Sequence, residues 1–155
     1  MSSLAPHAEK PLAVRIDPDR PEYPLGYWNW ITFSASDFDR SAAFYDRVLG
    51  FLGYRRTIDS DDFIMWQTLF GAVALKPAAE HGAPQADAPG VSEFIFFAPA
   101  PQDVDRFAAL LRGTGVHISE GPRPFPEVME GMYGVFFTDP DGTRLGLVHQ
   151  PPNFP

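Results

Sequence analysis

The pattern of hydrophobic and polar positions occurs twice along the chain. Residues 28–35 are rich in aromatic and β-branched residues, as in a strand, and residues 36–49 have the apolar spacing of an amphipathic helix. A constant offset over a whole strand–helix unit indicates an internal duplication. A shift of 63 positions superposes Trp30 on Glu93, Phe33 on Phe96, Phe44 on Phe107 and Gly50 on Gly113.

The first copy predicts one helix and four strands. Ser36, followed three residues later by Asp39, is close to a capping box, and the acidic side chain suits the positive end of a helix dipole. Gly50 is a natural place for the helix to end. Three further runs typical of strands follow, separated by turn-forming residues. The strands of this copy are predicted at 28–35, 54–58, 63–69 and 72–76.

The second copy repeats this order after a linker rich in Pro, Ala and Gly. A proline-rich loop at 121–131 makes its middle longer than that of the first copy. Asp139-Pro140-Asp141-Gly142 has the chemistry of a type I turn and joins the last two strands. The fold class is therefore α+β, with a βαβββ unit twice. The predicted elements are strands 92–98, 115–119, 132–138 and 144–149, and a helix at 102–112.

These elements indicate a single domain over residues 27–150. We call residues 27–76 module one and residues 91–150 module two, with the linker at 77–90 between them. Residues 1–26 form an N-terminal arm whose five prolines exclude a sustained helix, although residues 12–16 could add a short edge strand. Residues 151–155 are a C-terminal tail.

Composition narrows the function classes. The chain has no cysteine, so disulfides, thiolate metal sites and cysteine nucleophiles are excluded. The formal net charge of −8 disfavours nucleic acid as a partner. No apolar run approaches the ~20 residues that span a bilayer, and no secretory signal follows Met1. These features predict a cytoplasmic protein that acts neither on nucleic acid nor in a membrane.

Two segments carry a resemblance to a known family. ITFSASDFDRSAAFYDRVLGF, at 31–51, and MYGVFFTDPDGTRLGLV, at 132–148, resemble the vicinal oxygen chelate superfamily. That group contains glyoxalase I, extradiol dioxygenases, fosfomycin-resistance enzymes and bleomycin-resistance proteins. The resemblance implies two modules whose eight strands form a curled mixed sheet around a groove, with helices outside, and a homodimer as the common assembly.

The resemblance also implies where a divalent metal would bind. Metal-dependent members use His, Gln or Glu from the first and fourth strands of each module. The matching positions are Trp30, Ala74, Glu93 and Gly146, and three of these cannot coordinate an ion. One carboxylate does not retain a divalent ion against water. We therefore predict no metal and no other cofactor.

The remaining candidates are aromatic and charged residues that could face the groove. Strand parity places Trp30 and Phe97 there, and Trp66 and Tyr133 are further candidates for its walls. Glu93 is the only candidate for an acid or base and could also bind a cationic group, although it could instead pair with Arg144 or an ordered water. We also consider Arg123, in the proline-rich loop, as a cover for a carboxylate ligand. The alternative is that the rings simply fill the groove.

Three functions are consistent with these features. The first is a metal-free protein, similar to bleomycin-resistance proteins, that binds a small organic ligand in an aromatic groove. The second is a metal-dependent lyase, isomerase or dioxygenase of the glyoxalase type. The third is a noncatalytic interaction module with a filled groove. Loss of the metal-ligand positions favours the first, and the sequence does not decide whether catalysis occurs.

Overall fold

The computed structural model describes residues 28–79 and 91–151. The predicted N-terminal arm, with its possible strand at 12–16, and most of the linker lie outside the described residues. Module one contains β1 (Trp30–Ala35), α1 (Phe38–Phe51), β2 (Arg55–Asp59), β3 (Ile64–Thr68) and β4 (Gly71–Pro77). Module two contains β5 (Glu93–Phe97), α2 (Pro101–Gly113), β6 (Ile118–Pro124), β7 (Tyr133–Thr138) and β8 (Arg144–His149).

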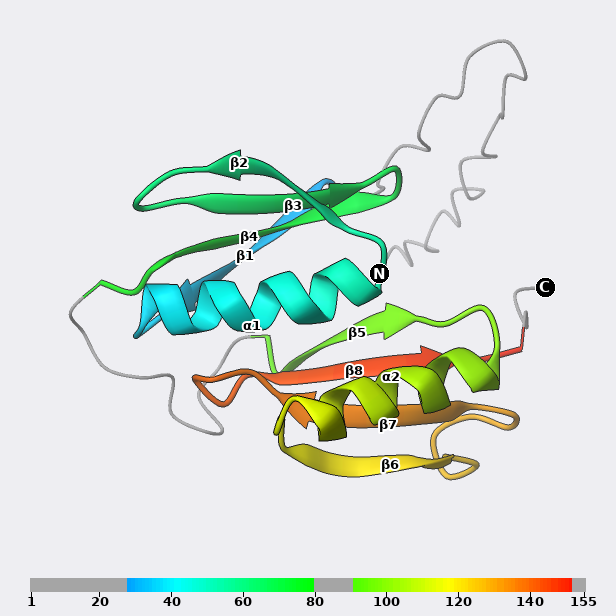
Figure 1. The fold of residues 1–155 in the computed structure, drawn as a ribbon. Coiled ribbons are helices and arrows are strands. Elements are labelled where there is room, and N and C mark those ends of the chain that lie inside the picture. Colours follow the sequence, from blue (N-terminus) through cyan, green and yellow to red (C-terminus); the bar gives the residue numbers. More distant parts are fainter. Residues whose placement is uncertain (1–27, 80–90, 152–155) are drawn as a thin grey trace, which may run out of the picture.

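Both modules have the same strand order. Sheet one runs β1-β4-β3-β2 and sheet two runs β5-β8-β7-β6, as Figure 1 shows. In each sheet the first strand is parallel to the fourth, and the other neighbours are antiparallel. The helices keep the offset of 63 positions at their start, Phe38 in one and Pro101 in the other. This repetition confirms the predicted α+β fold with two tandem βαβββ modules.

The start of α1 differs from the prediction. Asp37, rather than Ser36, is the N-cap, and its Oδ1 accepts the backbone N–H of Arg40 at 3.0 Å. Ser36 instead donates its backbone N–H to Oδ2 of Asp141, 3.1 Å away, and its hydroxyl also bonds the Asp141 carboxylate. The predicted N-cap is therefore one residue away from the observed one. The partner of Ser36 is determined by a contact between the two modules.

The second strand of module two was also predicted wrongly. β6 covers Ile118–Pro124 instead of residues 115–119 and therefore runs into the proline-rich segment. It is an end strand of sheet two, where a proline without an N–H is tolerated. Its pairing with β7 shifts register twice, between Ile118 and Glu120 and between Glu120 and Arg123.

The two modules share one hydrophobic core. It contains buried residues of α1, α2 and both sheets. The ring of Phe51 in α1 lies 5.4 Å from that of Phe107 in α2, and the ring of Phe44 lies 6.3 Å from that of Phe137 in β7. In Figure 1, α1 lies between sheet one and module two. The helix-covered faces of the two sheets therefore face this common core, and the eight strands form two separate sheets.

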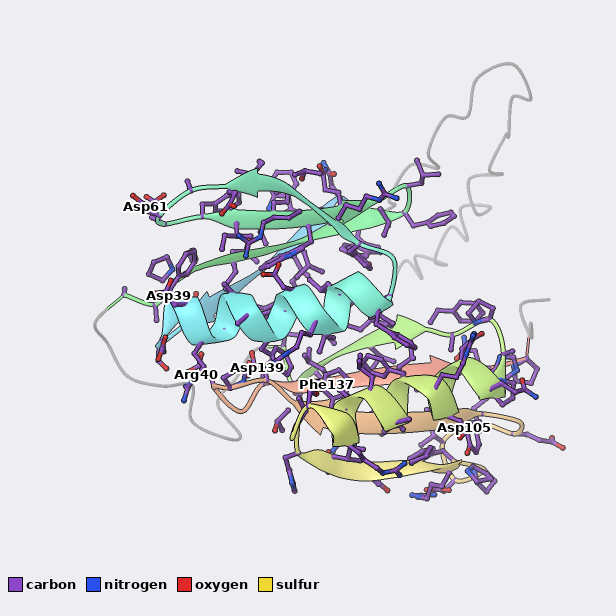
Figure 2. All side chains as sticks on the ribbon, viewed as in Figure 1. Asp39, Arg40, Asp61, Asp105, Phe137 and Asp139 are labelled. Carbon is purple, nitrogen blue, oxygen red and sulfur yellow. The ribbon has the colours of Figure 1, made fainter. Side chains whose placement is uncertain are left out.

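The turn at residues 139–142 joins module two to α1. Asp139 is buried, and its Oδ1 accepts the backbone N–H groups of Asp141 and Thr143 at 3.0 and 2.8 Å. Its Oδ2 accepts the hydroxyl of Tyr45, 2.8 Å away in the core. Arg40 adds a bond to the carbonyl oxygen of Pro140 at 3.3 Å. Figure 2 shows Arg40 and Asp139 at this junction.

In the described residues, no helix is long and apolar enough to cross a membrane.

Candidate functional site

Each sheet has a second face, which points away from the common core. In β1, Phe33 and Ala35 are buried in the core, whereas Trp30, Thr32 and Ser34 are exposed on the other side. The period of two in a strand explains this division. We call the faces opposite the helices open face one, on sheet one, and open face two, on sheet two.

Open face one has an apolar floor of small side chains, which is bordered by polar residues. These are Thr32, Ser34, Gln67 and Lys76. Trp30 lies beside Ala72 in the register, and Ala74 lies between Thr32 and Met65 on the neighbouring strands. Ala72, Ala74 and Met65 form a buried cluster with Phe63 packed against it. Trp30 is 55% exposed at the edge of this floor. A planar or apolar group could lie flat against such a surface.

Open face two is charged. Glu93 pairs with Arg144 across β5 and β8, and Glu120 pairs with Phe136 across β6 and β7. The side chains of these cross-strand pairs share one face of the sheet. The edge strand β6 also places Arg123 beside Gly134 on the same side. The polar groups of three strands therefore meet above Phe136.

These groups form one chain of ion pairs. Nε of Arg144 donates to Oε2 of Glu93 at 2.9 Å, and its Nη2 lies 3.5 Å from Oε2 of Glu120. Nη2 of Arg123 donates to Oε1 of Glu120 at 2.5 Å and to Oε1 of Glu127 at 2.6 Å. We call these five residues the charged ladder. The prediction that Glu93 could pair with Arg144 is confirmed.

Aromatic rings support both arginines of the charged ladder. The guanidinium carbon of Arg144 lies 4.3 Å from the ring centre of Phe136, and that of Arg123 lies 3.8 Å from the ring centre of Phe125. Phe125 and Phe136 belong to a small buried cluster on this face. Cation–π contacts of this kind fix the plane of a guanidinium group. The ladder is therefore partly held in place before any ligand arrives.

The ion pairs also shift the acidity of the ladder. The hydrogen bond from Arg123 lowers the pKa of Glu120 and of Glu127 below the ordinary value. The same bonds, that to Glu127 first, raise the pKa of Arg123. Because these side chains are solvent-accessible, screening by water keeps the individual contributions small. Both glutamates therefore stay ionised at neutral pH, as the acceptors of the ladder.

The four positions at which the family would place metal ligands do not fit a divalent ion. Trp30 and Ala74 offer no donor atom for hard cations. A Cβ added at Gly146 would lie 2.9 Å from Cδ1 of Phe136, so the ring already fills that place. Glu93 is bound to Arg144. Within residues 28–79 and 91–151, no group of three or more His, Cys, Asp or Glu side chains is placed to hold a metal ion.

Two predicted groove residues lie on the other side of their sheets. Trp66 is buried in the common core, where its indole N–H donates to Oδ1 of Asp46 on α1 at 2.8 Å. Tyr133 packs against the same core, and its hydroxyl donates to Oδ1 of Asp105 on α2 at 2.7 Å. Neither side chain reaches an open face. The aromatic groove wall predicted from four rings therefore reduces to Trp30 and Phe97.

Phe97 is 63% exposed on open face two and also borders a separate cleft along the edge of β5. This cleft has a volume of about 590 Å³. Its lining includes Trp28, Leu52, Tyr54, Thr68, Phe70 and residues 94–97.

Two residues of open face two, Glu120 and Phe136, were not predicted from the sequence. The signal for Glu120 was hidden because the predicted strand ended one residue before it.

Comparison with known proteins agrees with this architecture. A family model described as Glyoxalase/Bleomycin resistance protein/Dioxygenase superfamily matches residues 28–147. A search of curated proteins gave no match.

Solved structures show the same fold. A candidate glyoxalase from Bacillus halodurans is 21% identical, with a TM-score of 0.73 over 81% of this chain and 97% of that chain. A glyoxalase/bleomycin resistance protein from Albidiferax ferrireducens T118 is 24% identical, with a TM-score of 0.61 over 79% of this chain and 98% of that one. Lactoylglutathione lyase from Agrobacterium tumefaciens is 19% identical, with a TM-score of 0.58 over 78% and 91%. By its match over nearly all of both modules, the chain belongs to the glyoxalase/bleomycin resistance protein/dioxygenase superfamily.

Proposed function

We propose that this protein binds a small organic ligand without a divalent metal ion. The ligand lies in a groove between open face one of one chain and open face two of a second chain. The contrast between the two faces carries the proposal. Open face one offers Trp30 above a floor of alanines, and open face two offers the charged ladder. A ligand with a planar apolar part and a polar end would match both surfaces.

The groove requires two chains, because α1 and the common core lie between the two sheets of one chain. We propose a homodimer in which open face one of each chain faces open face two of the other. Trp30, Ile95 and Phe97 are exposed on these faces. In the described residues, β1 and β5 each have a strand neighbour on one side only, which leaves edges for association. Burial of these residues favours dimerisation.

The charge of the ladder limits the ligand. Three glutamates and two arginines leave one net negative charge, and both guanidinium groups already bind carboxylates. A carboxylate ligand would have to displace a glutamate from Arg123 or Arg144. The ladder thus favours a cationic or neutral polar end over an anionic one. We therefore propose that Arg123 positions Glu120, in place of the direct role in binding a carboxylate that the sequence suggested.

A charge series of planar probes tests this function. We expect 1-naphthylmethylammonium and 1-naphthol to quench tryptophan fluorescence saturably and to raise the melting temperature, and 1-naphthoate to bind at least about tenfold more weakly. Trp30→Ala should abolish the effect. Leu69→Ala, which removes an exposed side chain from the β3–β4 turn, should leave binding unchanged. Failure of all three probes to bind would favour an interaction module with a filled groove.

The assembly is tested separately. Light scattering at micromolar concentration should give twice the chain mass of 17.2 kDa. Trp30→Asp should lower the measured mass, because it places a charge on the surface that the partner would cover. A mass of one chain for the unmodified protein would contradict the shared groove.

A further inference from the structure

A cleft runs along the outer edge of β5, and we call it the β5 cleft. Its walls come from the segment before β1, the segment after α1, the β3–β4 turn and β5 itself. Its volume of about 590 Å³ lies within the range of about 300–1,000 Å³ that is usual for sites of small organic molecules. Both modules contribute walls, so a single folded chain forms the cleft without a partner.

Packed aromatic rings form one wall of the β5 cleft. The ring centre of Trp28 lies 5.5 Å from that of Phe94, and the ring centre of Phe96 lies 5.0 Å from the latter. The ring of Tyr54 extends the row, 6.1 Å from that of Phe96. All three contacts are edge to face, an arrangement that stabilises aromatic pairs. A Cβ added at Gly71 would lie 2.8 Å from Cη2 of Trp28, so the glycine makes room for the indole, and the wall is in place before any ligand binds.

Phe70 lines the β5 cleft from the β3–β4 turn, and 67% of its surface is exposed. The hydroxyl of Thr68 accepts the backbone N–H of Phe70 at 3.1 Å and donates to the carbonyl oxygen of Gly71 at 3.3 Å. These two bonds fix the turn and therefore the position from which the ring of Phe70 projects. A planar ligand in the cleft would cover this exposed ring.

The edge of β5 adds hydrogen-bonding groups to the cleft. The backbone N–H of Ala98 donates to the carbonyl oxygen of Val148 on β8 at 2.7 Å. Backbone groups of successive residues alternate in direction along a strand, so the N–H and C=O of Ile95, three residues earlier, point to the outer edge. In the described residues, no strand pairs with this edge of β5. One donor and one acceptor on the same residue match the C=O and N–H of an amide.

The charge of the lining limits the ligand further. Among the lining residues, all of which belong to the described parts of the chain, there is no Lys, Arg, His, Asp or Glu, although the chain carries a formal net charge of −8. A charged group that entered the cleft would lose water without gaining a counter-charge. The β5 cleft therefore favours an uncharged ligand, in contrast to the charged ladder on open face two.

We propose that the β5 cleft is a second ligand site and that it binds an uncharged aromatic carboxamide. The aromatic part lies against Trp28 and Phe70, and the amide exchanges two hydrogen bonds with the backbone of Ile95. The inference goes beyond the proposed function, because the cleft belongs to one chain whereas the groove requires two. The competing occupant is a second copy of the chain, because Phe97 borders both the cleft and open face two.

The test uses 2-naphthamide and the full chain with Trp30→Ala. This substitution disables the proposed groove, so any binding that remains belongs to another site. We expect isothermal titration calorimetry to show about one 2-naphthamide bound per chain. Adding Phe70→Ala or Phe70→Leu should weaken binding at least about tenfold, because both substitutions remove the ring. Adding Leu69→Ala, the matched control, should leave the affinity unchanged, since this exposed side chain lies in the same turn but outside the cleft lining.

Two analogues test the chemistry of the ligand. The ketone 2-acetylnaphthalene keeps the carbonyl group but has no N–H, and it should bind about three- to tenfold more weakly than 2-naphthamide. The anion 2-naphthoate carries a charge and should bind at least about tenfold more weakly. Equal affinities for the three compounds would show only binding to an apolar surface and would overturn the assignment of a carboxamide site.

The remaining outcomes separate this inference from the proposed function. If 2-naphthamide binds the unmodified protein but not Trp30→Ala, it occupies the groove, so the β5 cleft is wrong and the proposed function gains support. If it binds neither protein, the β5 cleft is wrong, and saturable binding of 1-naphthylmethylammonium would still support the groove. If 2-naphthamide does not bind and Phe70→Ala lowers the mass measured by light scattering, a second copy covers the cleft, which also overturns the inference.

Discussion

The bond between Tyr45 and Asp139 should be a large single polar contribution to the stability of the fold. The tyrosine is fully buried, its ring stacks on Phe33 with centres 5.5 Å apart, and its hydroxyl donates to Oδ2 of Asp139 at 2.8 Å. Tyr45→Phe removes only the hydroxyl and keeps the ring packing. The buried carboxylate then loses one of its three donors, the other two being the N–H groups of its own turn.

The expected loss follows from the type of bond. Hydrogen bonds to charged groups contribute about 1.5–3 kcal/mol, and a buried acceptor left without its partner adds a desolvation cost. For a chain of this size, that free energy corresponds to a fall in melting temperature of about 3–12 °C. Urea unfolding at one fixed protein concentration measures the change, since association would otherwise alter the apparent stability.

Tyr133→Phe is the control for removal of a tyrosine hydroxyl. Its hydroxyl also donates to an aspartate, Asp105, at 2.7 Å, but this bond is exposed to solvent. We expect a loss below about 1 kcal/mol from this variant. A double-mutant cycle of Tyr45→Phe with Asp139→Asn should give a coupling of at least about 1 kcal/mol. Additive losses, or equal losses for the two tyrosines, would refute the proposed strength of the junction.

Three further predictions concern the acidity of Tyr45, the ion pairs of Arg123 and the backbone at Gly121. Burial, and then the carboxylate of Asp139, raise the pKa of Tyr45 far above its ordinary value of 10.0. The contribution of Tyr45 to the free energy of unfolding is therefore present below pH 10 and lost as the pH rises further. Absorbance at 295 nm should show one tyrosine that ionises only when the protein unfolds. This absorbance change should be missing in Tyr45→Phe. Arg123 lowers the pKa of its two glutamates, so their contribution is present above the ordinary value of 4.5 and lost below it. Arg123→Gln should flatten the fall of the urea midpoint on acidification; an unchanged slope would count against the ladder. Gly121 has φ +82° and a backbone oxygen 2.4 Å from the place of an added Cβ, whereas Gly142 has φ +87° and open space. Gly121→Ala should cost more than about 2 kcal/mol in urea unfolding, and Gly142→Ala about 1 kcal/mol.

The fold could be predicted because its signals are local and occur twice. Phe33 and Phe96 take equivalent places in the first strand of each module, as do Phe44 and Phe107 in the helices, and all four are buried in the common core. Strand parity also placed Trp30 and Phe97 on exposed faces, since β1 and β5 alternate between buried and exposed residues.

The errors occurred where both faces of a strand are apolar. Ile64, Met65 and Trp66 are consecutive and all buried, so no alternation shows which face carries the indole. The same holds for Tyr133, which precedes four buried residues in β7. In β6, the two register shifts determine which residues face the ladder. Such shifts depend on pairing with a distant strand and leave no periodic signal.

The packing of one module on the other could not be read from the sequence either. Strand and helix patterns are the same whether the open faces of one chain meet each other or point away. The bonds of Ser36 to Asp141 and of Tyr45 to Asp139 decide the matter, and they join residues about one hundred positions apart. The local pattern around Ser36 predicts a helix cap, and the pattern around the two aspartates predicts a turn. Neither pattern contains a sign of the contact between them.

These contacts explain why the family motif says much about the fold and little about the chemistry. Tyr45 and Asp139 come from the two segments that carry the resemblance, and their bond lies in the common core, on the side of the sheets opposite the open faces. The two segments of the motif therefore supply the residues that join the modules. Residues on the open faces can change without disturbing that junction, as the pairing of Glu93 with Arg144 illustrates. A search for ligands should therefore start from the composition of the two open faces, and the family motif does not guide it.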